Sequence, residues 1–176
     1  DVLFGIINYK KMRIRYEFIM WYQQLIKFIP GKLGCFSRNL LLPYKNGDNV
    51  LIWDGTHIDS PAKLIIGNNV SINRGCVINA AGKITIASNV LIGPGVVIYS
   101  QNHVHNDSDI NINEQGYITA PVIINKNVWI GSRAIILPGV TIGANSIIGA
   151  GSVITQNIAD NSIYAGNPAK LIRKRC

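Results

Sequence analysis

The side chains best suited to chemistry lie in one polar stretch, residues 100–121, with the sequence SQNHVHNDSDININEQGYITAP. It contains His103 and His105, two of the three histidines in the chain. A histidine has a pKa near 6.5 in water, so it can take a proton from a weak nucleophile at neutral pH. In an extended segment these two rings would share a face. Asp107 and Asp109 follow, and a carboxylate can orient such a base through its other ring nitrogen. The stretch therefore predicts general base chemistry.

This stretch interrupts a regular pattern that indicates the fold. Isoleucine recurs at every sixth position, in three series: Ile66, Ile72, Ile78 and Ile84; Ile86, Ile92 and Ile98; and Ile124, Ile130, Ile136, Ile142, Ile148 and Ile154. A helix would repeat near 3.6 residues and a half-buried strand every two. A fixed short period is typical of a solenoid of short strands and turns. A loop that leaves a solenoid buries little apolar surface, and such loops usually carry function.

The chain divides into three parts: residues 1–50, a helical segment and linker; residues 51–165, a solenoid with an extended loop at 99–121; and residues 166–176, a tail. Within the first part, residues 8–29 are predicted to form a helix that Pro30 and Gly31 end, and residues 31–50 are predicted to be irregular. The helix and the tail would cap the apolar ends of the solenoid. The basic start and aromatic face of the helix allow packing on the solenoid or a neighbouring subunit, which we favour, or contact with an anionic membrane.

The composition describes one globular chain of 176 residues with a net charge of +8. The basic residues gather at the two ends and are not interleaved with aromatic residues through the repeats, so we expect no nucleic-acid partner. A phosphorylated small molecule or a membrane surface suits such ends better. Three cysteines without metal-type spacing favour a reducing compartment. We therefore expect a cytoplasmic protein, with contact at the inner membrane face left open.

Three segments carry a family resemblance: NVWIGSRAIILPGVTIGANSIIGAGSVIT, then IYAGNPAKLIRKR, and the histidine loop that follows GPGVVIYS. Together with the repeat they resemble the hexapeptide-repeat acyltransferases, and most of all the maltose, galactoside, nodulation and polysaccharide O-acetyltransferases. The resemblance spans most of the solenoid and the tail. It implies an all-β solenoid, a left-handed parallel β-helix of triangular section, that assembles as a homotrimer with active sites between neighbouring subunits.

The resemblance also implies an activity, the acetyl-CoA-dependent O-acetylation of a sugar hydroxyl. His103 lies at the family's catalytic position and would be the general base. Asn73, in the segment INRGC, matches an asparagine that contacts the reacting groups. Its amide would orient the acceptor hydroxyl or donate to the developing oxyanion.

Acetyl-CoA is the cosubstrate that the resemblance implies, and no metal is expected. The pantetheine groove would be lined by residues from the last repeats: Trp129, Ser132, Ala150 and Thr155. Lys170 and Arg173 match basic tail positions that meet the nucleotide phosphates.

The acceptor is less well defined, because this loop reads NHVHNDSDININEQGY where the small-sugar enzymes carry an HPLD-type sequence. This difference favours a glycan, a lipid-linked glycan or a nucleotide sugar of a polysaccharide pathway. Three other functions share the fold: N-acetylation of an amino sugar or a serine-type acceptor, a zinc carbonic anhydrase of the gamma type, and a non-catalytic assembly module. The gamma type needs three zinc-binding histidines, and His57, His103 and His105 do not have its spacing.

Overall fold

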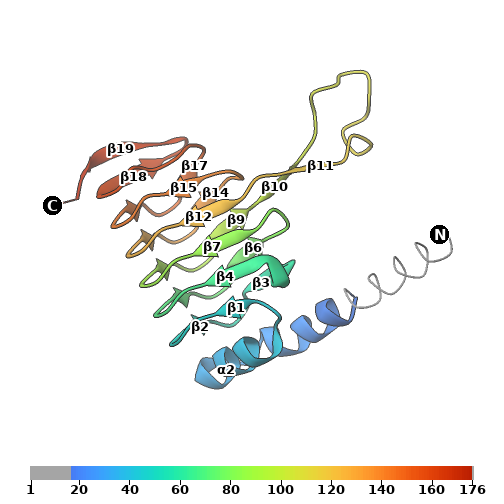
Figure 1. The fold of residues 1–176 in the computed structure, drawn as a ribbon, viewed down its shortest axis with the longest axis vertical. Helices are drawn as coiled ribbons and strands as arrows, with labels where there is room; N and C mark the ends of the chain where they lie inside the picture. The colour runs from blue at the N-terminus through green and yellow to red at the C-terminus, as the bar shows by residue number, and fades with distance from the viewer. Residues whose placement is uncertain (1–16, 176) are drawn as a thin grey trace.

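Residues 17–175, which the computed structural model describes, form a triangular solenoid with helices at its N-terminal end (Figure 1). Each coil contributes one short strand to each of three parallel sheets. Sheet A contains β1 (Lys45–Asn46), β4 (Leu64–Ile66), β7 (Ile84–Ile86), β12 (Val122–Ile124) and β15 (Thr141–Ile142). Sheet B contains β2 (Leu51–Ile52), β5 (Ser71–Ile72), β8 (Leu91–Ile92), β13 (Trp129–Ile130), β16 (Ile147–Ile148), β18 (Ser162–Gly166) and β19 (Ala169–Lys174). Sheet C contains β3 (His57–Asp59), β6 (Val77–Asn79), β9 (Val97–Tyr99), β14 (Ile135–Ile136) and β17 (Val153–Ile154).

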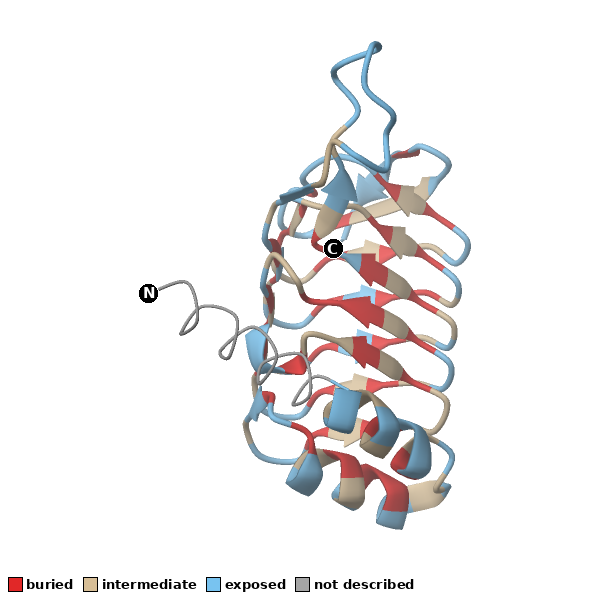
Figure 2. Cartoon of the chain, turned by 90° about the vertical axis from the view of Figure 1, so that its right-hand side faces the viewer, coloured by how far each residue is buried: buried red, intermediate tan, exposed pale blue. Residues whose placement is uncertain are grey.

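The six-residue isoleucine pattern forms the core, as expected. Every isoleucine of the three series is at most 3% exposed, and the residue that precedes each of them is partly or fully exposed (Figure 2). Trp129 pairs with Ile147, 18 residues on, which is three sextets per coil. Isoleucine side chains of successive coils stack on one another and fill the interior. Burial of each isoleucine stabilises the fold by about 1.5–3 kcal/mol.

The two-residue shift between Ile84 and Ile86 has a simple cause in sheet A. Strand β7 is three residues long, and both of these isoleucines point into the core while Thr85 between them is partly exposed. The neighbouring strands β4 and β12 have the same buried–outward–buried pattern. The shift is therefore a property of one strand, and the solenoid continues without a break.

The three corners of the triangle are built differently. At the corner from sheet A to sheet B, six asparagines adopt the left-handed conformation: Asn49, Asn69, Asn89, Asn127, Asn145 and Asn161. Asparagine tolerates positive φ better than other residues with a side chain. Amides along this corner also bond from coil to coil, as from Asn127 Nδ2 to Asn145 Oδ1 at 3.0 Å. At the corner from sheet B to sheet C the left-handed position is mostly glycine, as at Gly95 and Gly151.

The N-terminal cap consists of a helix over residues 17–27 and helix α2 (Gly31–Leu41). The prediction of irregular structure from residue 31 is therefore wrong for α2, while residues 8–16 of the predicted first helix lie outside the described residues. The side-chain amide of Gln23 replaces the hydrogen bonds that a further strand of sheet C would make. It donates to Ile58 O at 3.0 Å and accepts from Ile58 N at 2.6 Å. Arg38 donates from Nε to Ile52 O at 2.7 Å and so covers sheet B.

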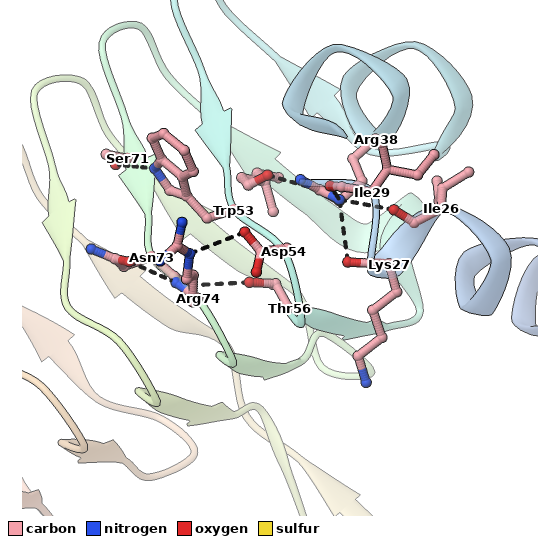
Figure 3. A network of polar contacts seen from close by, with 11 residues as sticks. Ile26, Lys27, Ile29, Arg38, Trp53, Asp54, Thr56, Ser71, Asn73 and Arg74 are labelled. Atoms are coloured by element: carbon pink, nitrogen blue, oxygen red, sulfur yellow. Dashed lines mark hydrogen bonds and ion pairs between the residues drawn. The ribbon is translucent and has the colours of Figure 1, made fainter. Parts of the chain in front are cut away.

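Arg38 also holds the two helices together. Its side chain is buried, and its Nη1 donates to the carbonyls of Ile26 at 2.8 Å and Ile29 at 3.1 Å, at the end of the first helix (Figure 3). The negative end of a helix dipole stabilises a cation there. Gly34 permits this packing, since a Cβ at that position would lie 1.8 Å from Ile29 O. The close contact explains why α2 includes a glycine that lowers its helix propensity.

The opposite end is closed by a hairpin. β18 continues sheet B in parallel with β16, and β19 then turns back antiparallel to β18. Among the residues that the structure describes, none belongs to a helix long and apolar enough to cross a membrane.

Candidate active site

His103 is carried by a hairpin that leaves the solenoid at the corner from sheet C to sheet A. β10 (Gln101–His103) pairs antiparallel with β11 (Tyr117–Thr119), and His103 lies opposite Tyr117 with the ring centroids 4.4 Å apart. A pocket of about 260 Å³ opens beside the two rings, and Leu137 and Pro138 of the next coil close its other side. The hairpin therefore presents an exposed imidazole at the mouth of a mainly apolar pocket.

The carboxylates that follow His103 do not contact it. Asp107 Oδ1 accepts from the backbone N–H of Asp109 at 2.9 Å, and Gln115 Nε2 donates to the carbonyl of Asp107 at 2.7 Å. These bonds shape the loop. The sequence hypothesis that Asp107 or Asp109 orients His103 is therefore not supported. His105 Nδ1 instead lies 3.1 Å from the carbonyl of His103, and its ring is exposed.

Asn73 follows β5 at the corner from sheet B to sheet C, within a polar cluster (Figure 3). Its Oδ1 accepts from the backbone N–H of Arg74 at 2.8 Å, which fixes the orientation of the amide. Arg74 bonds to Asp54 through its Nε at 3.1 Å and lies over the ring of Trp53. Within residues 17–175 no protein group is bonded to Asn73 Nδ2, so this donor is free for a ligand.

Asn73 and His103 are not brought together within one chain. Asn73 lies at the corner from sheet B to sheet C, whereas the hairpin of His103 leaves the corner from sheet C to sheet A. The pocket beside His103 is lined by residues of the hairpin and of its own corner, without Asn73. A single chain therefore holds two parts of the expected site on two different edges of the triangle.

Two of the residues expected to bind acetyl-CoA line one groove. Ser132 and Ala150 lie on successive coils at the corner from sheet B to sheet C, in a groove of about 680 Å³. Pro94, Gly95, Arg133 and Gly151 line it as well. Because all of these residues except Arg133 are small, the groove can accept an extended chain that bonds to backbone groups.

Trp129 and Arg173 share the outer face of sheet B. Trp129 pairs in register with Ile147, Ile147 with Ile163, and Ile163 with Arg173. Three strand spacings separate Trp129 from Arg173, which is about 14 Å. Lys170 is also exposed on β19, opposite Ala165. The structure thus aligns an exposed indole with the basic tail along one face.

Thr155 lies elsewhere. It follows β17 at the corner from sheet C to sheet A and is exposed, so it does not line the groove that contains Ser132 and Ala150. It shares its corner with the hairpin that carries His103.

A third concavity has a basic lining. Lys45, Lys63 and Lys83 line a groove of about 420 Å³ on the first coils, together with Thr119 of β11. No carboxylate lines it. The groove lies at the corner from sheet C to sheet A, so the hairpin of His103 borders both this groove and the apolar pocket. An anionic group would be attracted to it.

Several site residues were not predicted from the sequence. Tyr99, Tyr117, Leu137 and Pro138 surround the imidazole, and Trp53 lies in the cluster beside Asn73. A tyrosine at each root of the loop was a usable signal, because aromatic side chains often line ligand pockets. The histidines do not converge: His57 Nε2 lies 3.1 Å from Asp59 Oδ1 on β3, and residues 17–175 contain no group of three metal-binding side chains.

Comparison with known proteins agrees with this architecture. The family model described as bacterial transferase hexapeptide (six repeats) matches residues 121–156. A hexapeptide-repeat-containing acetyltransferase of Vibrio cholerae, solved with acetyl coenzyme A, superposes with a TM-score of 0.84 at 26% identity over 94% of this chain and 90% of that one. A galactoside acetyltransferase in complex with coenzyme A superposes with a TM-score of 0.80 at 32% identity over 94% and 81%.

An enzyme that acylates nitrogen is also similar. A variant of an N-acyltransferase of Bacillus cereus, in complex with dTDP-4-amino-4,6-dideoxyglucose and coenzyme A, has a TM-score of 0.61 at 27% identity over 80% of this chain and 89% of that one. The solenoid and these comparisons together define an acyltransferase. The chain belongs to the hexapeptide-repeat acetyltransferases, and its solenoid is a left-handed parallel β-helix.

Proposed function

We propose that the protein transfers the acetyl group of acetyl-CoA to a sugar hydroxyl, with His103 as general base. The observation that carries this proposal is the exposed imidazole beside a pocket of about 260 Å³, on a hairpin that leaves an otherwise regular solenoid. The similar enzymes solved with coenzyme A or acetyl coenzyme A support the cosubstrate.

The chemistry follows from these groups. The acceptor oxygen attacks the thioester carbonyl carbon while His103 accepts its proton, and a tetrahedral oxyanion forms. The free Nδ2–H of Asn73 donates to that oxyanion or positions the acceptor. When the C–S bond breaks, the imidazolium returns its proton to the CoA sulfur. The products are the acetyl ester and free CoA, and the enzyme is regenerated.

The complete site requires two copies of the chain. Asn73, Ser132 and Ala150 occupy the corner from sheet B to sheet C, and His103 occupies the corner from sheet C to sheet A. In a trimer of parallel prisms, one corner of each copy faces a different corner of the next. We place the active site in that cleft, where Thr155 of one copy faces the groove of its neighbour.

Acetyl-CoA would lie along the groove of Ser132 and Ala150, with Trp129 beside it and the nucleotide toward the tail. The register from Trp129 to Arg173 supports this direction. Lys170 and Arg173 would bind the phosphates, because cations on an exposed strand can reach them with little desolvation.

The acceptor is proposed to be a glycan, a lipid-linked glycan or a nucleotide sugar of a polysaccharide pathway. The groove of Lys45, Lys63 and Lys83 beside the hairpin supports an acceptor with a negative group, such as a phosphate. N-acetylation is the second candidate, because the similar Bacillus cereus enzyme was solved with an amino-sugar nucleotide. An amine is a better nucleophile and would depend less on His103 than a hydroxyl does.

We place the reaction in the cytoplasm. Cys35 and Cys76 are both buried as free thiols, which agrees with a reducing compartment.

Replacing His103 with Ala tests the base. We expect turnover to fall by about 10²–10⁴-fold, with the binding of acetyl-CoA and the thermal stability kept, since the ring is exposed. The His105→Ala variant is the matched control, because that ring lies two residues away and should change turnover little. Equal losses in both variants would mean that the loop, and not the imidazole of His103, is what matters.

Mixing two inactive variants tests the shared site. Asn73→Ala and His103→Ala chains would be unfolded together and refolded into mixed trimers, and the initial rate would be compared with each variant alone. If the site lies between copies, some clefts in mixed trimers combine an intact Asn73 with an intact His103, and activity returns. If both residues act from one chain, mixing restores nothing. Rates with hydroxyl and amino acceptors of the same sugar separate the two reactions.

A further inference from the structure

The two helices of the cap expose more apolar side chain than any other part of the described chain. Eight large residues are between 45% and 74% exposed: Phe18, Trp21, Leu25, Phe28, Leu33, Phe36, Leu40 and Leu41. Monomeric soluble proteins rarely leave a contiguous apolar patch of this kind uncovered, and such patches mark partner or membrane surfaces. We call these residues the apolar face of the cap.

This face points away from the solenoid. On the first helix Gln23 and Ile26 are buried against the first coil, whereas Trp21 and Leu25 lie on the other side of the helix. On α2, Arg38 is buried, and Phe36 and Leu40 are exposed on the opposite side. Both helices therefore have an inner face that closes the prism and an outer apolar face without a partner among residues 17–175. Figure 2 shows the helices of the cap at the end of the prism, with exposed positions in pale blue.

The charges around the face are basic. Lys27 and Lys32 are next to it, with Lys27 Nζ 5.5 Å from the centroid of the Phe28 ring. Glu17 is the one acidic residue between residues 17 and 41, and Arg38 is buried. The sequence immediately before the cap adds Lys10, Lys11, Arg13 and Arg15. An aromatic and aliphatic face rimmed by cations is complementary to an anionic lipid surface.

The position of the apolar face on the prism indicates whether a membrane or a second copy of the chain covers it. Copies that associate side by side, as the shared active site requires, meet along the corners and leave the ends of the prism outside. The outer face of the cap lies at such an end, so a trimer would present three of these faces in the same direction. Three weak anchors on one plane reinforce each other, because the second and third bind without further diffusion.

We propose that the apolar face of the cap docks the protein on an anionic membrane, with Trp21, Phe36 and their neighbours inserted at the level of the headgroups. This assignment rests on the side-by-side association of the proposed function and does not depend on which acceptor is used. The enzyme would then be a peripheral membrane protein, with the N-terminal end of its solenoid against the lipid surface.

Flotation with vesicles tests the docking. The full chain would be mixed with vesicles of phosphatidylcholine alone or with 30% phosphatidylglycerol. We expect binding at least about tenfold stronger to the anionic vesicles, and weaker binding at high salt. Trp21→Ser with Phe36→Ser should reduce binding by about tenfold or more. Ile112→Ser is the matched control, because Ile112 is 58% exposed but lies in the loop between β10 and β11.

A charge pair completes the test. Lys32→Glu should weaken binding to the anionic vesicles by about fivefold or more, whereas Lys126→Glu, the same change at an exposed position on the solenoid, should have less effect. Equal binding to neutral and anionic vesicles, or unchanged binding by the Trp21 and Phe36 double variant, would overturn the proposal. So would a smaller oligomer of that double variant without lipid, measured by light scattering, because the face would then be covered by another copy.

Discussion

Two corners of the triangle need residues in the left-handed conformation, and they use different residue types to provide it. Where sheet A meets sheet B, left-handed asparagines bond to each other from coil to coil, as Asn145 does to Asn127 and Asn161. Where sheet B meets sheet C, Gly95 and Gly151 adopt the same conformation and leave a groove of about 680 Å³. The backbone requirement is shared, so the choice of residue reflects use. We propose that asparagine closes one corner for stability and that glycine keeps the other open for a ligand.

The comparison is sharpest at Ala150, on the open corner. Ala150→Trp should fill the groove that we assign to acetyl-CoA. We expect the KM for acetyl-CoA to rise by about 100-fold, because the indole would occupy the space of the pantetheine arm. Ala150 is exposed, so the free energy of unfolding should change by about 0.5 kcal/mol or less. Steady-state kinetics and thermal unfolding check both expectations. An unchanged KM would show that the cosubstrate does not use this corner.

The basic tail should give the next largest effect. The double variant Lys170→Ala and Arg173→Ala should bind acetyl-CoA about tenfold more weakly, because it loses two cations that we expect to face the phosphates. If they bind the 3′-phosphate, dephospho-CoA should be affected much less, and competition assays with both ligands measure the difference. Lys174→Ala, on the same strand, is the control. A loss that is equal for both ligands would argue against a contact with the 3′-phosphate.

The closed corner should respond in stability and not in activity. Asn145→Ala should cost about 2 kcal/mol, because alanine disfavours the left-handed conformation and the amide bonds are lost. Asn145→Gly keeps the conformation and should cost about half as much. Denaturant unfolding measures both, with KM for acetyl-CoA expected to stay unchanged. A rise in KM in either variant would mean that the two corners do not divide their roles as proposed.

A smaller effect concerns Cys76, a buried residue directly before β6 at the corner from sheet B to sheet C. Burial raises the pKa of its thiol to about 11, and Sγ bonds to the carbonyl of Gly93 at 3.3 Å. The unfolded chain therefore loses this proton near pH 9 while the folded chain keeps it, so stability should fall as the pH rises from about 9 to 11. Tyr44 has a raised pKa too, through burial, but its unfolded phenol titrates only near pH 10. Unfolding between pH 8.5 and 9.5 thus reports mainly on the thiol, and Cys76→Ala should flatten that part of the profile.

Periodicity made the solenoid predictable, because one residue in six faces the same environment in every coil. Ile130 and Ile136 were identified as core from spacing alone, and both are fully buried. Helix α2 was not predicted. Its large apolar residues are exposed while Gly34, Cys35 and Arg38 are buried, which is the reverse of the usual amphipathic pattern, and Gly34 lowers its propensity. What stabilises it is the packing of Arg38 against carbonyls of other elements, a tertiary interaction that local sequence does not reveal.

The candidate site was predictable by residue and not by arrangement. Histidine in a loop that breaks a regular pattern is a strong signal, and His103 does lie beside a pocket. Spacing says nothing of which corner a residue occupies, so the separation of Asn73 from His103 emerged only from the coil register. The carboxylates of the loop show the same limit, because Asp107 was near His103 in sequence but bonds within the loop.

The helical cap and the terminal hairpin have a consequence for association. A stack of parallel strands with bare first and last coils would add further chains end to end, and such growth has no natural stop. Gln23 and Arg38 occupy the backbone groups that would start a fibre at one end, and β19 folds back over the other. The number of copies is therefore limited by contacts along the sides of the prism, so that the same chain can favour a closed ring over a filament.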